Sequence, residues 1–400
     1  MNIVINLIGI ILLLGIMYIL SADKRSIPKK TILKALGIQF VIAFLLVKFP
    51  LGRIMILKVS DVVTQVLDYG KEGIGFLFGT IGNAGAPTGM IFAIQVLGNI
   101  VFISALVAAL YYLGILGFIV KIIGKAIGKI LGTTQVESFV AVANMFLGQT
   151  ESPILVSKYL NRMTDSEIIV VLVSGMGSMS ATIIGGYTAL GIPMEYLLIA
   201  SALVPMGSIA ISKLLLPEKE ETQLIENVSM DNKGDNENLI SAISEGAMSG
   251  FQTAVAIGTS LLAIISLVAL VNGILGIFGV SLQQIFSYIF APIGFFMGLN
   301  GSDILTAGQL LGSKLVLNEF VAFQDLGNIF GSLSYRTGLV LTISLCGFAN
   351  ISSMGVCISG IAALCPEKRN TLARLAFKAM IGGFAVSVLS AMIVGLLTLI

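Results

Sequence analysis

Residues 133–163 read TTQVESFVAVANMFLGQTESPILVSKYLNRM, and this stretch decides how the chain can fold. It is largely apolar, but these polar and helix-breaking residues make it unfit for a simple lipid-facing span: Glu137, Asn144, Gly148, Gln149, Glu151 and Pro153. Basic residues, which favour the cytoplasm, flank it at 121–129 and at Lys158 and Arg162. We therefore predict a re-entrant hairpin, whose irregular backbone must be buried in protein or line a water-filled cavity.

A second stretch of this kind occupies residues 301–328, GSDILTAGQLLGSKLVLNEFVAFQDLGN. Its polar and helix-breaking residues are Asp303, Gly308, Gly312, Lys314, Asn318 and Glu319. Each predicted hairpin precedes a span interrupted by small polar residues, GMGSMS at 175–180 and GFANISS at 347–353. This repeated order, with the hairpins opening to opposite sides, is typical of inverted-repeat secondary transporters.

The composition places the whole chain in a membrane. Of 400 residues, 56% are hydrophobic and only 11% are charged, with a mean hydropathy of +1.01. A soluble surface needs roughly a quarter of charged residues. The net charge of +2 argues against a nucleic-acid partner, and the absence of histidine excludes zinc–histidine and Ser-His-Asp chemistry. Without acidic metal-binding clusters either, we expect neither an enzyme nor a cofactor.

Cysteine usage agrees with a membrane interior. The three cysteines have apolar flanks and an odd number, which predicts buried thiols instead of a disulfide framework: Cys346, Cys357 and Cys365.

Eight apolar runs are long enough to cross the hydrocarbon as helices. They lie at about 2–20, 31–49, 91–113, 166–190, 194–215, 250–275, 336–358 and 372–400. Residues 51–90 and the lysine-bearing stretch 121–129 have the pattern of interfacial amphipathic helices. The prediction is an all-α membrane protein with about eight transmembrane helices, two re-entrant hairpins and interfacial helices, arranged as an inverted repeat.

The expected organisation has five segments. An N-terminal scaffold with an interfacial helix occupies 1–113, and a scaffold span with an interfacial helix occupies 246–300. The first half of a transport domain occupies 114–216, with its hairpin at 133–163 and broken helix at 166–190, and a polar linker follows at 217–245. The second half of the transport domain occupies 301–400, with its hairpin at 301–328 and broken helix at 336–358.

Glu151 and Glu319 are the strongest functional candidates, because a carboxylate at membrane depth costs at least a few kcal/mol. The alternative is structural: each could pair with a nearby lysine, Lys158 or Lys314, to hold its hairpin. Both lysines could instead extend toward an interface.

Other polar groups at the predicted breaks extend these two candidate sites. Gln149 and Thr150 beside Glu151 could recognise the edge of a planar amide-bearing ring, or simply cap helices. Asn350 and Ser353 share a helical face and, with a carboxylate, suit a sugar with vicinal hydroxyls, although small polar residues also join membrane helices.

Asn144 and Ser178 could form part of a different site. Together with carbonyls freed at the predicted breaks, they would provide an uncharged pocket of oxygen atoms, which is a way in which broken-helix transporters bind Na+.

Residues 312–323, GSKLVLNEFVAF, resemble the G/A-x-K-x3-N-E-F-V-A-aromatic/Met signature of the concentrative nucleoside transporter family. Residues 148–153, GQTESP, resemble its first-hairpin motif, although many members have Ala at the position of Ser152. The resemblance extends over most of the chain and implies a multi-pass protein of the cell membrane.

The resemblance also implies roles for individual residues. The nucleobase site would comprise Gln149, Thr150, Glu151 and Ile183, and the ribose site Glu319, Asn350 and Ser353 with Phe348 nearby. The Na+ site would comprise Asn144, Ser178 and the backbone carbonyls of Leu147 and Met179. Similar members are homotrimers that meet through their third and sixth spans.

We therefore expect a symporter that imports uridine and other pyrimidine nucleosides, and also adenosine, with Na+. Coupling to H+ remains an alternative, as does a Na+-coupled carrier of another small neutral polar solute. The expected partners are the nucleoside, Na+ or H+, the lipid bilayer and two further copies of the chain.

Overall fold

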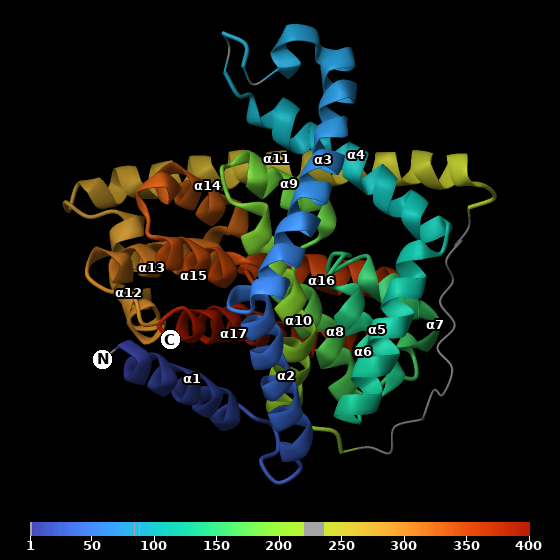
Figure 1. Ribbon diagram of the computed structural model, residues 1–400, viewed down its shortest axis with the longest axis vertical. Coiled ribbons are helices and arrows are strands. Elements are labelled where there is room, and N and C mark those ends of the chain that lie inside the picture. The colour runs from blue at the N-terminus through green and yellow to red at the C-terminus, as the bar shows by residue number, and fades with distance from the viewer. Residues whose placement is uncertain (1, 84, 88, 220–235) are drawn as a thin grey trace.

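The computed structural model describes residues 2–83, 85–87, 89–219 and 236–400, and within these ranges it is a helical bundle without strands (Figure 1). Seven described helical segments are long and apolar enough to cross a membrane: Asn2–Ile19, Lys29–Val47, Phe92–Tyr112, Asp165–Ala189, Met194–Leu215, Leu239–Gly276 and Pro366–Leu397. They coincide with seven of the eight predicted spans. The eighth, at 336–358, consists of two shorter helices separated by a break.

The N-terminal part supplies the outer helices. In order they are α1 (Asn2–Ile19), α2 (Lys29–Val47), α3 (Pro50–Phe78), the 3-10 turn η1 (Gly79–Gly82) and α4 (Phe92–Tyr112). Pro50 opens α3 at a position where its missing N–H costs nothing. The helix α3 continues from α2 along nearly the same direction and extends beyond the main bundle (Figure 1). It contains most of the residues of the predicted interfacial segment 51–90.

The amphipathic helix α5 (Ile115–Leu131) leads into the first hairpin. Glycines in the left-handed conformation, Gly114 and Gly132, flank it. Its lysines are exposed, whereas Gly124 and Gly128 are buried against the hairpin residues Phe139 and Ser138. The helix thus has the two faces that the lysine spacing predicted.

The first hairpin consists of α6 (Gln135–Ala143), the 3-10 turn η2 (Ser152–Val156) and α7 (Ser157–Leu160). A capping box between Thr134 and Glu137 starts α6, and residues 144–151 between the two arms are not helical. The following span is broken into α8 (Asp165–Gly177) and α9 (Ala181–Ala189), and α10 (Met194–Leu215) completes this half.

The second half repeats this order of elements. The long helix α11 (Leu239–Gly276) precedes α12 (Leu282–Phe296), which packs against the next hairpin. That hairpin comprises α13 (Ser302–Gly312), the π-helical turn η3 (Ser313–Leu317), α14 (Glu319–Ile329) and η4 (Phe330–Ser332). A broken helix follows, α15 (Tyr335–Leu345) and α16 (Ile351–Leu364), and then η5 (Pro366–Lys368) and α17 (Arg369–Leu397).

The two helix breaks cross each other at the centre of the molecule. The backbone N–H of Phe348 donates to the carbonyl of Ser178 over 3.1 Å. Gly347 has φ +110°, and a Cβ there would lie 2.8 Å from the carbonyl oxygen of Gly177. A Cβ at Gly383 of α17 would lie 2.9 Å from the Gly177 nitrogen. Glycine is therefore required where these backbones touch.

A buried ion pair fixes the base of the first half. The ammonium of Lys213 on α10 contacts the Glu137 carboxylate on α6 and also donates to the Ser166 hydroxyl on α8 over 2.9 Å. Because removing one partner would leave an uncompensated buried charge, this contact ties the three helices together. The remaining core is apolar, and the three cysteines are confirmed as buried free thiols.

Candidate functional site

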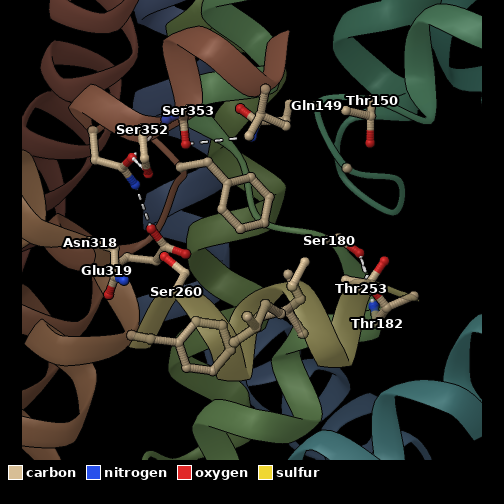
Figure 2. A pocket seen from close by; sticks show the side chains of 18 of the residues that line it. Gln149, Thr150, Ser180, Thr182, Thr253, Ser260, Asn318, Glu319, Ser352 and Ser353 are labelled. Atoms are coloured by element: carbon tan, nitrogen blue, oxygen red, sulfur yellow. Dashed lines mark hydrogen bonds between the residues drawn. The ribbon is translucent and has the colours of Figure 1, made fainter. Parts of the chain in front are cut away.

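A cavity of about 290 Å³ lies where both hairpins, both broken helices and α11 converge (Figure 2). Nineteen residues line it: Gly148, Gln149, Thr150, Glu151, Ser180, Thr182, Ile183, Thr253, Ala256, Ile257, Ser260, Asn318, Glu319, Phe320, Phe348, Asn350, Ser352, Ser353 and Val356. All eight residues predicted to contact a base or a ribose are among them. Small-molecule sites commonly have volumes upward of roughly 300 Å³, so the cavity suits a small ligand.

The predicted base-recognition residues occupy the side formed by the first hairpin. Gln149 is 9% exposed, and its amide nitrogen donates to the Ser353 hydroxyl over 3.4 Å. The Cys357 thiol donates to the amide oxygen of Gln149 over 3.2 Å. The Glu151 carboxylate accepts from the Gly148 N–H at 3.5 Å. The Gln149 side chain therefore bridges the first hairpin and α16.

Of the predicted sugar-recognition residues, Glu319 and Asn350 lie away from Gln149, whereas Ser353 contacts it. Glu319, 6% exposed, begins α14, and its carboxylate accepts a 2.7 Å hydrogen bond from the amide of Asn350. The Asn350 oxygen in turn accepts from the Ser353 N–H and from the Ser352 hydroxyl. Figure 2 shows Glu319 and Gln149 on different sides of the cavity, with Ser353 next to Gln149.

Three helix N-termini begin at residues that line the cavity. Ser180 caps α9, Asn318 caps α14 and Asn350 caps α16, and each side chain accepts a hydrogen bond from the first turn of its helix. Because helix N-termini carry partial positive charge, the N-terminus of α14 stabilises the carboxylate of Glu319 in its first turn. The result is a cavity that combines acceptors and donors without a buried basic side chain in its lining.

The sequence-based prediction missed part of the lining. Asn318 and Ser352 adjoin residues that were identified, and their capping role explains their positions. Thr182 and the α11 residues Thr253 and Ser260 were not identified. Thr253 and Ser260 are seven residues apart and share a helical face, which was the available signal.

The predicted cation ligands come from two nonhelical segments in contact. Asn144, at the end of α6, donates to the Ser174 hydroxyl over 2.9 Å and accepts from the Ser152 hydroxyl. The Ala181 N–H bonds to the Phe146 carbonyl over 2.9 Å, so the hairpin tip packs against the α8–α9 break.

All four predicted cation ligands are buried: Asn144, Leu147, Ser178 and Met179. They provide amide, hydroxyl and carbonyl oxygens near helix C-termini, which suits a hard monovalent cation. No group of three or more His, Cys, Asp or Glu residues that could hold a metal occurs in the described ranges.

A membrane bundle in which two hairpins and two broken helices surround a cavity with two carboxylates in its lining has the architecture of a secondary transporter. Comparison with known families agrees. The Na+ dependent nucleoside transporter C-terminus model matches residues 196–395, the corresponding N-terminus model matches residues 8–81, and a nucleoside recognition "Gate" model matches residues 93–194.

Individual relatives cover the full chain. The uncharacterized transporter YutK of Bacillus subtilis is 38% identical over 99% of this chain and 100% of its own length. The nucleoside permease NupC of Helicobacter pylori is 37% identical over 98% and 97%. A solved structure of CNTnw in an inward-facing substrate-bound state superposes with a TM-score of 0.96 at 37% identity, covering 100% of this chain and 99% of that one.

The chain therefore belongs to the Na+-dependent, or concentrative, nucleoside transporter family. It is a multi-pass protein of the plasma membrane and a transporter, not an enzyme, since its relatives and its fold are those of transporters. In this family Na+ is a transported ion, and nothing indicates a bound cofactor.

Proposed function

We propose that this protein imports nucleosides, uridine and other pyrimidine nucleosides among them, together with Na+. The observation that carries the proposal is the single cavity in which Glu151 and Glu319 face a shared space from two different hairpins. One side offers an amide and a carboxylate for a base edge, and the other offers a charged acceptor for ribose hydroxyls. Adenosine is a further candidate substrate, which competition with uridine would test.

The Na+ part of the proposal depends on the segments 144–148 and 178–181. Their oxygens are neutral and buried, so a bound cation would supply the charge that these helix C-termini attract. The same segments hold Gln149 and Ser180 at the cavity. Binding of the ion and binding of the nucleoside would therefore organise one hairpin, which is the requirement for coupling.

The decisive experiment is uridine uptake into proteoliposomes that contain the purified protein. Uptake is measured with an inward Na+ gradient, then with an inward proton gradient at equal Na+, and then with neither. Accumulation that requires the Na+ gradient supports the proposal. Accumulation with the proton gradient alone would support H+ coupling instead, and saturable uptake of another polar solute without uridine uptake would contradict nucleoside transport.

We also propose how the protein moves and assembles. Segments 114–216 and 301–400 would form the moving domain, and the remaining spans a scaffold that includes α4 and α11. These two helices pack together, and α11 keeps large apolar residues exposed, including Leu262 at 72% and Leu270 at 61%. A homotrimer formed through them is testable by light scattering of the detergent-solubilised protein.

A further inference from the structure

Lys314 is a buried cation outside the cavity lining. It lies in the π-helical turn η3, and its side chain is fully buried at 0% exposure. The ammonium donates to the carbonyls of Ser344 over 2.9 Å and Cys346 over 3.1 Å, and to the Ser387 hydroxyl over 2.7 Å. Among the described residues, no ion pair includes Lys314. Its three N–H groups are thus used on neutral oxygens, and the ion pair with Glu319 that was the structural alternative is not among the ion pairs of the described residues.

The two carbonyls lie at the C-terminal end of α15. This helix ends at Leu345, so the carbonyls of Ser344 and Cys346 have no partner in the next helical turn. The helix dipole also places partial negative charge there. The chain then continues through the unwound segment 346–350, which carries Phe348 and Asn350 into the cavity. The ammonium therefore binds the backbone that positions two cavity residues.

The first half has a different arrangement at the matching place. Asn144, near the end of the first hairpin arm, contacts Ser174 in the last turn of α8, and α8 ends just before Ser178. Lys314, at the end of the corresponding arm of the second hairpin, contacts the last turn of α15. In these matching contacts the first half presents a neutral amide to the last turn of its helix, whereas the second half presents a covalently attached positive charge.

We propose that the Lys314 ammonium is a tethered cation that holds the unwound segment 346–350 in its substrate-binding conformation, so that a single solute cation serves both hairpins. This inference rests on the proposed function, because it gives the second hairpin the role that Na+ has in the first. Lys314 is a positioning residue, since it acts on the substrate through Phe348 and Asn350. Burying a charge is costly, and its three charge-assisted hydrogen bonds offset that cost.

The test compares two replacements, Lys314→Ala and Lys314→Met. Alanine leaves space for a free cation at the α15 carbonyls, whereas methionine fills the space with an uncharged chain. We expect both variants to raise the KM for uridine at least about tenfold, because hydrogen bonds to a charged group are lost. Methylammonium should restore uptake in the alanine variant alone, and the Na+ activation curve of that variant should become steeper than that of the wild type.

Controls distinguish a role that depends on the positive charge of Lys314 from one that depends only on the packing of its side chain. The wild-type protein is measured at the same methylammonium concentrations, which accounts for effects on the gradients. A folded variant with the wild-type KM would overturn the proposal, as would an alanine variant that neither methylammonium nor extra Na+ improves. If the wild type shows no Na+-driven uridine uptake, the proposed function fails. The role of Lys314 is then tested by thermal unfolding: methylammonium should raise the midpoint temperature of Lys314→Ala and leave that of Lys314→Met unchanged.

If both lysine variants fail to fold, Ser387→Ala tests whether Lys314 positions the segment 346–350. It removes the acceptor on α17 and keeps the charge, so the KM for uridine should rise several-fold while the steepness of the Na+ curve stays the same. Ser390→Ala, one turn further along α17, is the matched control: its hydroxyl accepts from Gln39 on α2 and donates to the Val386 carbonyl, whereas Lys314 bonds to Ser387, so this variant should keep the wild-type KM. Equal KM values for the two serine variants would overturn the proposal.

Discussion

The two hairpins reach similar positions around one cavity with different backbones. In the first, residues 144–151 between the arms are nonhelical, and their carbonyls are not all committed to helical hydrogen bonds. In the second, the π-helical turn η3 continues α13 almost to α14, and only Asn318 is extended. An open tip can present oxygens to an ion, whereas a nearly continuous helix presents a side chain. The difference teaches that two hairpins of one fold can offer different groups to the helix C-terminus beside them, a neutral side-chain amide in the first half and a lysine ammonium in the second.

The largest effect is expected from Glu319→Gln in the second hairpin. Glutamine keeps the shape and can still accept from Asn350, but it lacks the charge that ribose hydroxyls would bind. Uridine uptake into proteoliposomes should fall to the background of protein-free vesicles. Glu367→Gln, an exposed carboxylate outside the cavity, is the control and should retain uptake. Uptake by Glu319→Gln at the wild-type rate would remove the second hairpin from substrate recognition.

The sugar hydroxyls themselves provide the next test. A site built to bond a hydroxyl rejects analogues that lack it, because its buried polar groups are left without partners. The inhibition constant of 2',3'-dideoxyuridine against labelled uridine should exceed that of uridine by about hundredfold or more. Deoxyuridine should fall between them. Equal inhibition by uridine and the dideoxy analogue would show that the side of the cavity formed by Glu319 and Asn350 does not bind ribose.

Asn144→Ala tests the ion at the first hairpin. Loss of one oxygen ligand should raise the Na+ concentration for half-maximal uridine uptake about tenfold, equivalent to about 1.4 kcal/mol. Asn6→Ala is a matched control, because Asn6 is also buried but donates to the Met297 carbonyl elsewhere. If both variants keep the wild-type Na+ dependence, the segments 144–148 and 178–181 are not the cation site.

The smallest effect is expected on α11, which belongs to neither hairpin. Ser260→Ala should raise the KM for uridine by less than about fivefold, because one neutral hydrogen bond is worth about 1 kcal/mol. Thr259→Val, whose hydroxyl bonds to the Val255 carbonyl instead of lining the cavity, should leave the KM unchanged. If Ser260→Ala were as defective in uridine uptake as Glu319→Gln, α11 would contribute as much to substrate binding as the hairpins do. That result would contradict the proposed division between substrate-binding hairpins and scaffold.

Much of the fold could be predicted from the positions of polar and apolar residues. Seven apolar runs and both helix interruptions were located, because glycine and polar residues at membrane depth leave few structural options. The N-terminus of α11 was less accessible to prediction. Its first turns lie in the stretch 239–249, which was divided between a polar linker at 217–245 and the scaffold, and residues 220–235 of that linker lie outside the described residues.

The site was predicted as two sets of residues, and the structure joins them in one cavity. The motifs identified Gln149 and Glu319, but sequence spacing cannot show that residues 170 positions apart face each other. Thr253 and Ser260 were missed because the sequence of an apolar helix does not show whether its polar residues face lipid or a cavity. The partners of Lys314 were also inaccessible, since Ser344, Cys346 and Ser387 meet only through the crossing of helices.

The crossing of the two helix breaks has a consequence for the integrity of the polypeptide. Each half supplies what the other needs: the Ser178 carbonyl accepts from the backbone N–H of Phe348, and Gly347, without a Cβ, leaves the room that the Gly177 carbonyl requires. Fragments 1–219 and 236–400 made separately would each keep an unmet amide or carbonyl at their centres. Neither fragment should transport uridine alone, and the two produced together should restore transport.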